Sequence, residues 1–347
     1  MHLKIHDGVK HSKQLKLLVN VYPAYKKLAK FCDPTLNKLN MIGLVIKKGL
    51  ERSSKKYQIS NINVTQRNYT ANDCVDNIGF IGGGNIARAI GKGILGKELL
   101  NPRQIYVSEP YKPAQKLWME MGANVTIKNG QVVENCQIIF LAVKSTNLQA
   151  TVTDIQNTLS APVKNKIFVS ALAGIPLSVL EKVLLPVIPD ARIVRSTLNT
   201  PLLVGAGCTV LSGDSRTTDD DINKLKTIMS AIGTCHVVPE SQMNAAGGIV
   251  GCGPAYMYTM LDALSDGAVK MGIPRHLAVT FAAQVMYGSA KMILETGKHP
   301  GELKDQVCSP GGTTIAGLHA MERGKIRATL IEAVEAAVNR SEEIVGK

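Results

Sequence analysis

A glycine-rich segment near residue 80 has the spacing of a dinucleotide-binding turn. The run Asn77–Ala87 reads as a strand, a turn of three consecutive glycines and the start of a helix. Gly82 permits the tight turn, Gly84 lets the backbone approach a pyrophosphate, and Ala87 keeps helix and strand close. The pyrophosphate would then face the N–H groups and the positive dipole end of that helix. The spacing predicts a dinucleotide site, with a plain glycine turn as the alternative.

Polar residues end the second predicted strand, where the adenosine ribose of a dinucleotide would lie. Glu109 stands where an acid commonly accepts hydrogen bonds from that ribose. Such an acid disfavours a 2′-phosphate and therefore favours NADH. Ser108 and Lys112 could receive the phosphate instead, so the pattern leaves NADPH open as well.

Lys144 is expected to end the next strand, predicted over Ile138–Val143, at its carboxyl end. Open α/β sheets bind ligands at that edge. With Ala142 and Val143, the lysine would line the cofactor cleft and add positive potential near the site of hydride transfer. A strand-end lysine at the surface is the alternative.

A second run, Val307–Thr314, has the composition of an anion-binding helix start. Ser309 can cap a helix, Pro310 suits the first helical position, and two following glycines expose backbone N–H groups. These features predict a carboxylate site, with the hydroxyl of Thr313 or Thr314 beside the bound carboxylate. An ordinary capped helix explains the serine and the proline. It does not explain consecutive glycines, which weaken a helix start unless something approaches closely.

Alternating apolar runs and helical stretches must position the first of these runs. Strands are predicted at Ile78–Ile81, Ile105–Val107, Ile138–Val143, Ile167–Ser170, Arg192–Ser196 and Cys235–Val238. A helix is expected between Thr218 and Ile232, with Thr218 as its N-cap. Strand and helix alternation predicts parallel βαβ units. We therefore expect an α/β domain of the Rossmann type, a parallel sheet with covering helices, over residues 77–239.

No strand signal follows Pro239, and a second, all-helical domain is predicted over residues 240–347. Pro254 and Pro274 stand where first turns would begin, and Gly272 and Gly297 where helices would stop. Two of the helices carry apolar stripes, and the last, Ile326–Val345, is rich in Ala, Glu and Leu. Such helices without obvious internal partners predict packing against another subunit.

Composition excludes several classes of protein. With 45% hydrophobic and 19% charged residues, the 347-residue chain is globular, and no apolar run approaches the roughly 18 residues of a membrane span. Fourteen Lys and Arg against five acids in residues 1–76 supply most of the net charge of +13. This basic segment reads as a disordered extension without a nucleic-acid-binding pattern. Seven histidines without ligand spacing predict no metal site.

The compartment is predicted from the cysteines and from the basic extension. Seven scattered cysteines without a C-x-x-C pair fit a reducing compartment. Leu15–Lys30 could form a basic amphipathic helix, but Lys dominates where presequences are usually Arg- and Ser-rich. We expect a cytoplasmic protein, with mitochondrial import as the alternative.

The chain closely resembles pyrroline-5-carboxylate reductases over about residues 77–346. The resemblance is carried by Gly251–Tyr256, by Asp305 and by Ser309–Thr314, and it extends to Ala171–Gly174 and Asn199–Pro201. It implies a Rossmann domain followed by a helical dimerisation domain, often assembled as a decamer of five dimers. It also implies reduction of 1-pyrroline-5-carboxylate to L-proline with NADPH or NADH, the last step of proline biosynthesis.

The resemblance assigns roles to individual residues. Ser309, Gly312 and Thr314 would contact the substrate, with Val307 and Cys308 lining its pocket, and with Gly311 and Thr313 in the same run. The cofactor would lie against Ile81, Gly82, Gly84, Asn85, Ile86, Asn129, Ala142, Val143 and Lys144. Asn129 falls where relatives touch the adenosine phosphate or ribose. This leaves NADPH open as the cofactor, although Glu109 favours NADH. Thr314 would orient the ring nitrogen.

Three departures and two rival functions bear on this interpretation. The extension 1–76 has no counterpart in the family pattern, Leu198 stands where a proline is common, and Cys252 stands where a serine is common. A β-hydroxyacid dehydrogenase or another imine reductase would need its own catalytic lysine motif, which residues 240–300 lack. A non-catalytic sensor of nicotinamide redox state would bind cofactor without turnover.

Overall fold

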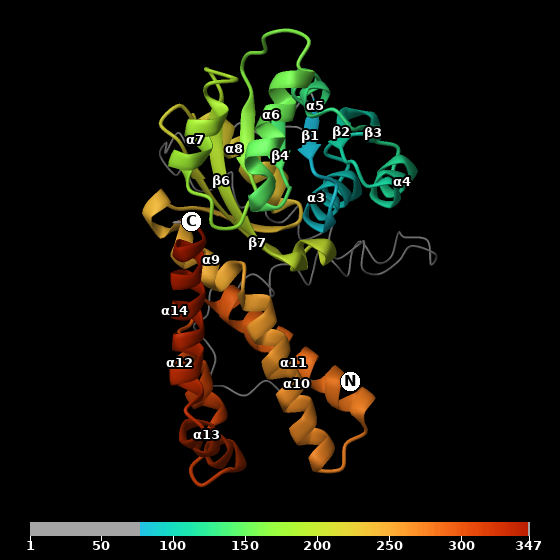
Figure 1. Cartoon of the computed structure of the whole chain (residues 1–347). Helices are drawn as coiled ribbons and strands as arrows, with labels where there is room; N and C mark the ends of the chain where they lie inside the picture. Colours follow the sequence, from blue (N-terminus) through green and yellow to red (C-terminus); the bar gives the residue numbers. More distant parts are fainter. Residues whose placement is uncertain (1–76, 346–347) are drawn as a thin grey trace, which may run out of the picture. The chain divides into compact units, whose positions relative to one another are not determined.

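The computed structural model describes residues 77–345 (Figure 1). The predicted extension 1–76, with its basic helix Leu15–Lys30, lies outside the described residues.

One eight-stranded sheet forms the first part of the described chain, in the order β3-β2-β1-β4-β5-β6-β7-β8. Its strands are β1 Ile78–Ile81, β2 Ile105–Ser108, β3 Asn124–Thr126, β4 Ile138–Leu141, β5 Ile167–Ser170, β6 Arg192–Leu198, β7 Gly207–Gly213 and β8 Gly233–Val237. All neighbouring pairs are parallel except β6 and β7. The Rossmann-type parallel sheet predicted from the sequence is confirmed.

The strand predictions were wrong in several details. β6 extends to Leu198 rather than to Ser196, and β8 spans Gly233–Val237 rather than Cys235–Val238. β3 and β7 were not predicted, and β4 ends at Leu141 rather than at Val143. β7 runs antiparallel to β6 because only the short helix η4, Thr200–Val204, and a turn at Gly205 join them. A parallel crossover needs a dozen or more residues, usually a helix, and this connection is too short for one.

Helices cover both faces of the sheet and bury a separate core on each. One core combines β-strand residues with α3 Asn85–Gly96, α4 Lys112–Glu120 and α8 Asp219–Ser230. The other involves α5 Asn129–Asn135, α6 Leu148–Thr158 and α7 Leu177–Leu184. Thr218 caps α8 as expected, in a capping box with Asp221. Strands buried on both faces explain the continuous apolar runs in the sequence.

Only helices follow β8 in the described residues, as expected. They are η5 Glu240–Gln242, α9 Met243–Val250, α10 Gly253–Lys270, α11 Arg275–Thr296, α12 Pro300–Val307, α13 Thr313–Arg323 and α14 Ile326–Val345. The predicted apolar stripes are largely exposed in the single chain: Leu264 is 54% exposed and Phe281 52%. By length and composition α11 could cross a membrane, although no span was predicted; one such helix is weak evidence for a span.

A buried arginine connects the sheet to these helices. Arg195 on β6 is 4% exposed, and its guanidinium donates to Glu240 Oε1 and to Asn244 Oδ1, both at 2.7 Å. The same Glu240 oxygen accepts from the N–H of Leu177, which begins α7, at 3.1 Å. The start of the helical region is thereby held against two elements of the sheet region.

Candidate functional site

The glycine turn between β1 and α3 has a backbone that only glycine adopts without strain. Gly82 has φ +94°, and its N–H donates to the carbonyl of Ser108 at 2.9 Å. A Cβ at this position would come within 2.7 Å of the carbonyl oxygen of Ala142. The turn is therefore packed between the ends of β2 and β4, at the carboxyl edge of the sheet.

The start of α3 fits the phosphates of a dinucleotide. Gly84 is the N-cap, no side chain caps the helix, and its first turn holds no acidic residue. A Cβ added to Gly84 would meet nothing within 4 Å, so a ligand can approach the backbone there. Asn85 is exposed, with its Oδ1 accepting a hydrogen bond from Arg88, and Ile86 is half-buried against the core. Uncapped N–H groups at a helix start attract anions.

Glu109 lies directly after β2 and its carboxylate faces the glycine turn. Oε2 accepts a hydrogen bond from the N–H of Gly83 at 2.7 Å, and Oε1 accepts one from the N–H of Tyr111 at 2.8 Å. Ser108 is buried, whereas Lys112, the first residue of α4, is exposed. The structure thus places the acid beside the turn and the lysine in solvent.

The predicted strand end at Lys144 is corrected. β4 stops at Leu141, and Lys144 is an exposed residue at the start of the short helix η3, Ser145–Asn147. Ala142 and Val143 are half-buried, and a Cβ at Gly82 would be 3.0 Å from Val143 Cγ1. These two residues therefore adjoin the glycine turn even though they lie beyond the strand.

Asn129 begins α5, and its contacts face α6. Its N–H donates to Asp154 Oδ2 at 2.9 Å, and its side-chain amide donates to the carbonyl of Thr151 at 3.4 Å. Within the described residues, its Oδ1 accepts no hydrogen bond. Asn129 is half-buried, so this oxygen is the part of the residue left for a ligand.

The predicted helix cap in the run Val307–Thr314 is wrong. α13 begins at Thr313 with Gly312 as N-cap, so Ser309 and Pro310 lie in the turn that precedes the helix. The carbonyl of Ser309 accepts the N–H of Gly312 at 3.0 Å.

The two glycines of this turn have local explanations. Gly311 has φ +67°, and a Cβ at Gly312 would come within 2.3 Å of Ser309 Oγ. The left-handed backbone at Gly311 favours glycine, and at Gly312 a side chain would first displace the hydroxyl of Ser309. Thr314 and Cys308 are half-buried, whereas Val307 and Thr313 are exposed.

The structure does not join the two predicted runs by any polar contact. Among the hydrogen bonds and ion pairs of residues 77–345, none links Val307–Thr314 to the glycine turn. A shallow pocket of about 730 Å³ beside the second run is lined only by residues of α12, α13 and the turn between them: Lys304, Gly311, Gly312, Ile315, Ala316, Leu318, His319, Glu322 and Arg323. Hydrogen bonding to Asp305 raises the pKa of Lys304 at this rim.

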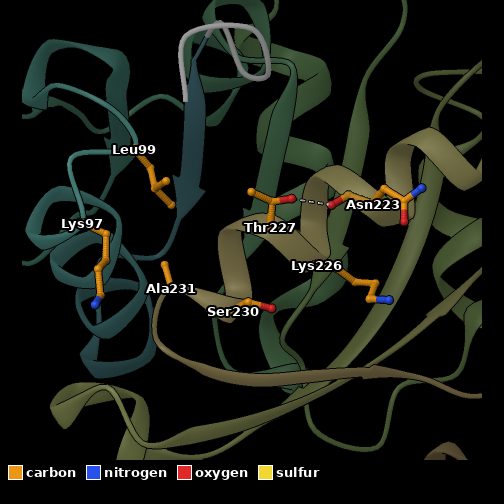
Figure 2. Close-up of a pocket in the computed structure, with 7 residues that line it drawn as sticks. All are labelled: Lys97, Leu99, Asn223, Lys226, Thr227, Ser230 and Ala231. Carbon is orange, nitrogen blue, oxygen red and sulfur yellow. Dashed lines mark hydrogen bonds between the residues drawn. The ribbon is translucent and has the colours of Figure 1, made fainter. Parts of the chain in front are cut away.

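Another pocket lies away from both runs, between the end of α3 and α8 (Figure 2). Figure 2 shows its two lysines, Lys97 and Lys226, with ammonium groups pointing away from each other. Thr227 donates its hydroxyl proton to the carbonyl of Asn223 at 2.9 Å. The cations do not converge, and no predicted site residue lines this pocket.

Trp118 contacts the glycine turn, although the sequence did not identify it as a neighbour of that turn. Its Nε1 donates to the carbonyl of Gly83 at 3.0 Å, and the side chain is fully buried. A Cβ at Gly83 would lie 2.7 Å from Trp118 Nε1, and one at Gly91 would lie 2.6 Å from its ring. Gly83 and Gly91 were the sequence features that could have revealed this contact, because an indole on α4 reaches the turn only if the residues facing it are small.

Two family models match the chain. One, described as pyrroline-5-carboxylate reductase dimerisation, matches residues 240–344. The other, described as NADP oxidoreductase coenzyme F420-dependent, matches residues 77–174.

Similar proteins cover the same part of the chain. Pyrroline-5-carboxylate reductase 2 of Bos taurus is 40% identical over 269 residues, which are 77% of this chain and 83% of the relative. Pyrroline-5-carboxylate reductase of Methanosarcina acetivorans is 39% identical over 77% of this chain and 97% of the relative. The crystal structure of Plasmodium falciparum pyrroline carboxylate reductase with NADP bound is 29% identical, with a TM-score of 0.69 over 78% of this chain and 98% of that one.

Proposed function

The chain belongs to the pyrroline-5-carboxylate reductase family, and we propose that it reduces the C=N bond of 1-pyrroline-5-carboxylate to give L-proline, the final step of proline biosynthesis. It is an NAD(P)H-dependent oxidoreductase. The observation that carries this conclusion is the 40% identity to the bovine relative over 269 residues. The uncapped glycine turn opening α3 supplies a matching anion site at the sheet edge.

The glycine turn, the start of α3, Ala142 and Val143 would hold the cofactor. Ile81, Gly82 and Gly84 shape the turn, and Asn85, Ile86, Ser108, Glu109, Asn129 and Lys144 would border the bound nucleotide. When bound, the reduced nicotinamide supplies the hydride for the imine carbon. The residues around it position the reactants and exclude water, which is the larger part of catalysis for such a transfer.

Residues 307–314 would hold the substrate. The N–H groups at the start of α13 can bind the substrate carboxylate, because no side chain caps that helix and its first turn holds no acid. Thr314 would orient the ring nitrogen through its hydroxyl, while Ser309, Gly311, Gly312 and Thr313 shape the carboxylate site and Val307 and Cys308 line the ring pocket. A protonated imine needs no strong side-chain acid.

A second copy of the chain is part of this proposal. The chain carries a dimerisation region and exposes apolar residues of α10 and α11 in the single copy. A homodimer would cover these apolar residues. The full assembly that we infer is a decamer of five dimers. We also infer that the second copy completes the site, because the dimerisation region contains the substrate run.

Proline formation by the purified full chain tests the proposal. With 1-pyrroline-5-carboxylate and either NADH or NADPH, oxidation of the cofactor should match proline formed. Cofactor binding without proline would favour the redox sensor instead. A β-hydroxyacid dehydrogenase is disfavoured because the lysines in residues 240–300, Lys270, Lys291 and Lys298, do not form the catalytic motif that such an enzyme would need.

The compartment stays a proposal of its own. We propose the cytoplasm, with mitochondria as the alternative, because residues 1–76 are rich in Lys rather than Arg. A fluorescent protein carrying residues 1–76 should remain cytoplasmic. Import into mitochondria would overturn this.

A further inference from the structure

The carboxylate of Glu109 cannot swing away from the glycine turn without cost. It accepts the N–H of Gly83 at 2.7 Å and the N–H of Tyr111 at 2.8 Å, one on each oxygen. The residue is only 9% exposed. A rotamer change would leave two backbone donors without an acceptor, and unpaired buried donors are costly. The negative charge at this edge of the sheet therefore has a fixed position.

The turn that faces this charge is fixed as well. Gly83 is held on both sides, since Glu109 accepts its N–H and Trp118 Nε1 donates to its carbonyl at 3.0 Å. Gln115 donates its amide to the carbonyl of Glu109 at 2.7 Å, which ties the acid to α4. The distance between the carboxylate and the phosphate-binding backbone is thus set before any ligand binds.

We propose that Glu109 is the specificity-determining residue of the dinucleotide site and makes it favour NADH over NADPH. The inference rests on the proposed function and names the cofactor that this function uses. A fixed carboxylate after β2 can accept hydrogen bonds from the adenosine ribose. It repels a 2′-phosphate, which carries nearly two negative charges. The contacts to Gly83 and Tyr111 prevent Glu109 from relieving that repulsion by turning aside.

Lys112 is a nearby cation that could offset this effect. It begins α4 and is exposed. Solvent and salt screen an exposed ammonium more strongly than a carboxylate that is mostly buried. The mostly buried carboxylate of Glu109 therefore contributes more to the local potential than the exposed ammonium of Lys112.

Calorimetric dissociation constants of NADH and NADPH for the full chain test the proposal without measuring turnover. The wild-type protein should bind NADH about tenfold more tightly than NADPH, the effect of one close like-charge contact in partly screened surroundings. Glu109→Gln removes the charge and should shift the ratio by about tenfold toward NADPH. Trp118→Phe loses the bond to Gly83 without changing charge, so it should weaken both cofactors equally. Glu120→Gln on exposed α4 is the matched control and should leave both constants unchanged.

Two results would overturn the proposal. One is wild-type protein that binds NADPH as tightly as NADH or more tightly, a measurement that does not depend on any variant folding. The other is an unchanged ratio in Glu109→Gln when its melting curve shows a folded protein. If the wild-type protein forms proline but binds NADPH at least as tightly as NADH, only this proposal is overturned. If it binds neither cofactor, the proposed function is overturned as well.

Discussion

The role proposed for Thr314 can be tested separately from the fold. The residue is half-buried in the first turn of α13, and no hydrogen bond of its side chain is present in the described residues. We expect Thr314→Ala to lower turnover by about tenfold to a hundredfold, because the ring nitrogen loses its orienting hydroxyl. The melting temperature should not change. Steady-state kinetics and thermal melts check this, with Thr227→Ala at an exposed position as the control. Turnover at the wild-type rate in Thr314→Ala would remove Thr314 from the mechanism.

Glu134 makes stability depend on pH far from the site. Its Oε1 accepts hydrogen bonds from the Oγ of Ser160, at 2.6 Å, and from the backbone N–H of the same residue, and these bonds lower the pKa of Glu134 below its ordinary value. A carboxyl group with a lowered folded-state pKa stabilises the fold above its ordinary pKa and loses that contribution as pH falls through the folded value.

Glu134→Gln should therefore lose about 0.5–1 kcal/mol of stability at pH 7, the scale of a partly solvated charged hydrogen bond. The difference from wild type should shrink as pH falls below the ordinary pKa of a glutamate and through the lowered pKa of Glu134. Urea melts across this range measure it. A difference that stays constant with pH would show that the carboxylate charge plays no part.

Single residues were partly predictable. The position of Glu109 after a strand predicted an acid at the carboxyl edge of the sheet, because parallel strand ends meet at one edge, and the structure places it there beside Gly83. The hydrogen bonds to Gly83 and Tyr111 were not predictable, since they depend on how closely two loops approach. Ser309 was misread for a similar reason: its cap pattern is local, but the left-handed Gly311 delays the helix until Thr313.

At the scale of elements, the three glycines of the turn are not equivalent. Gly83 has no room for a side chain, because a Cβ would lie 2.7 Å from Trp118 Nε1. We expect Gly83→Ala to cost about 1–3 kcal/mol of stability, the range for overpacking, and to weaken cofactor binding. Gly84 has φ −71° and open space around it.

Gly84→Ala should then lower the melting temperature of the free protein much less than Gly83→Ala does, because the methyl group meets no atom and only the N-cap preference for glycine is lost. It should still lower cofactor affinity, because the methyl group would stand where the pyrophosphate approaches. Thermal melts with and without cofactor compare the two variants. Equal destabilisation of the free protein by both would contradict the assignment of the open position.

Elements with strong local patterns were predicted and the others were missed. β1 and α14 have the predicted bounds because an unbroken apolar run and a long Ala-rich stretch mark them. β7 was missed because Gly207–Gly213 mixes glycines, Ser and Thr, and only pairing with β6 and β8 stabilises it as a strand.

At the scale of the whole molecule, the exposed apolar residues of α10 and α11 predict that assembly and activity fail together. Phe281 on α11 is 52% exposed in the single chain. Phe281→Asp would bury a charge at the interface and should reduce the dimer to monomers and abolish most turnover, while NADH binding persists. Light scattering and calorimetry measure these effects. As a control, Asn223→Asp on α8 adds the same charge to the sheet region. If the Phe281→Asp protein remained a dimer, the interface would lie elsewhere.

The position of Trp118 gives the molecule a built-in optical reporter. It is the chain's single tryptophan, and its indole touches the turn that would bind the dinucleotide. Indole emission overlaps the absorption band of reduced nicotinamide, so excitation of the unlabelled protein should transfer energy to a bound reduced cofactor. One fluorescence channel would then follow loading and release of the coenzyme in real time.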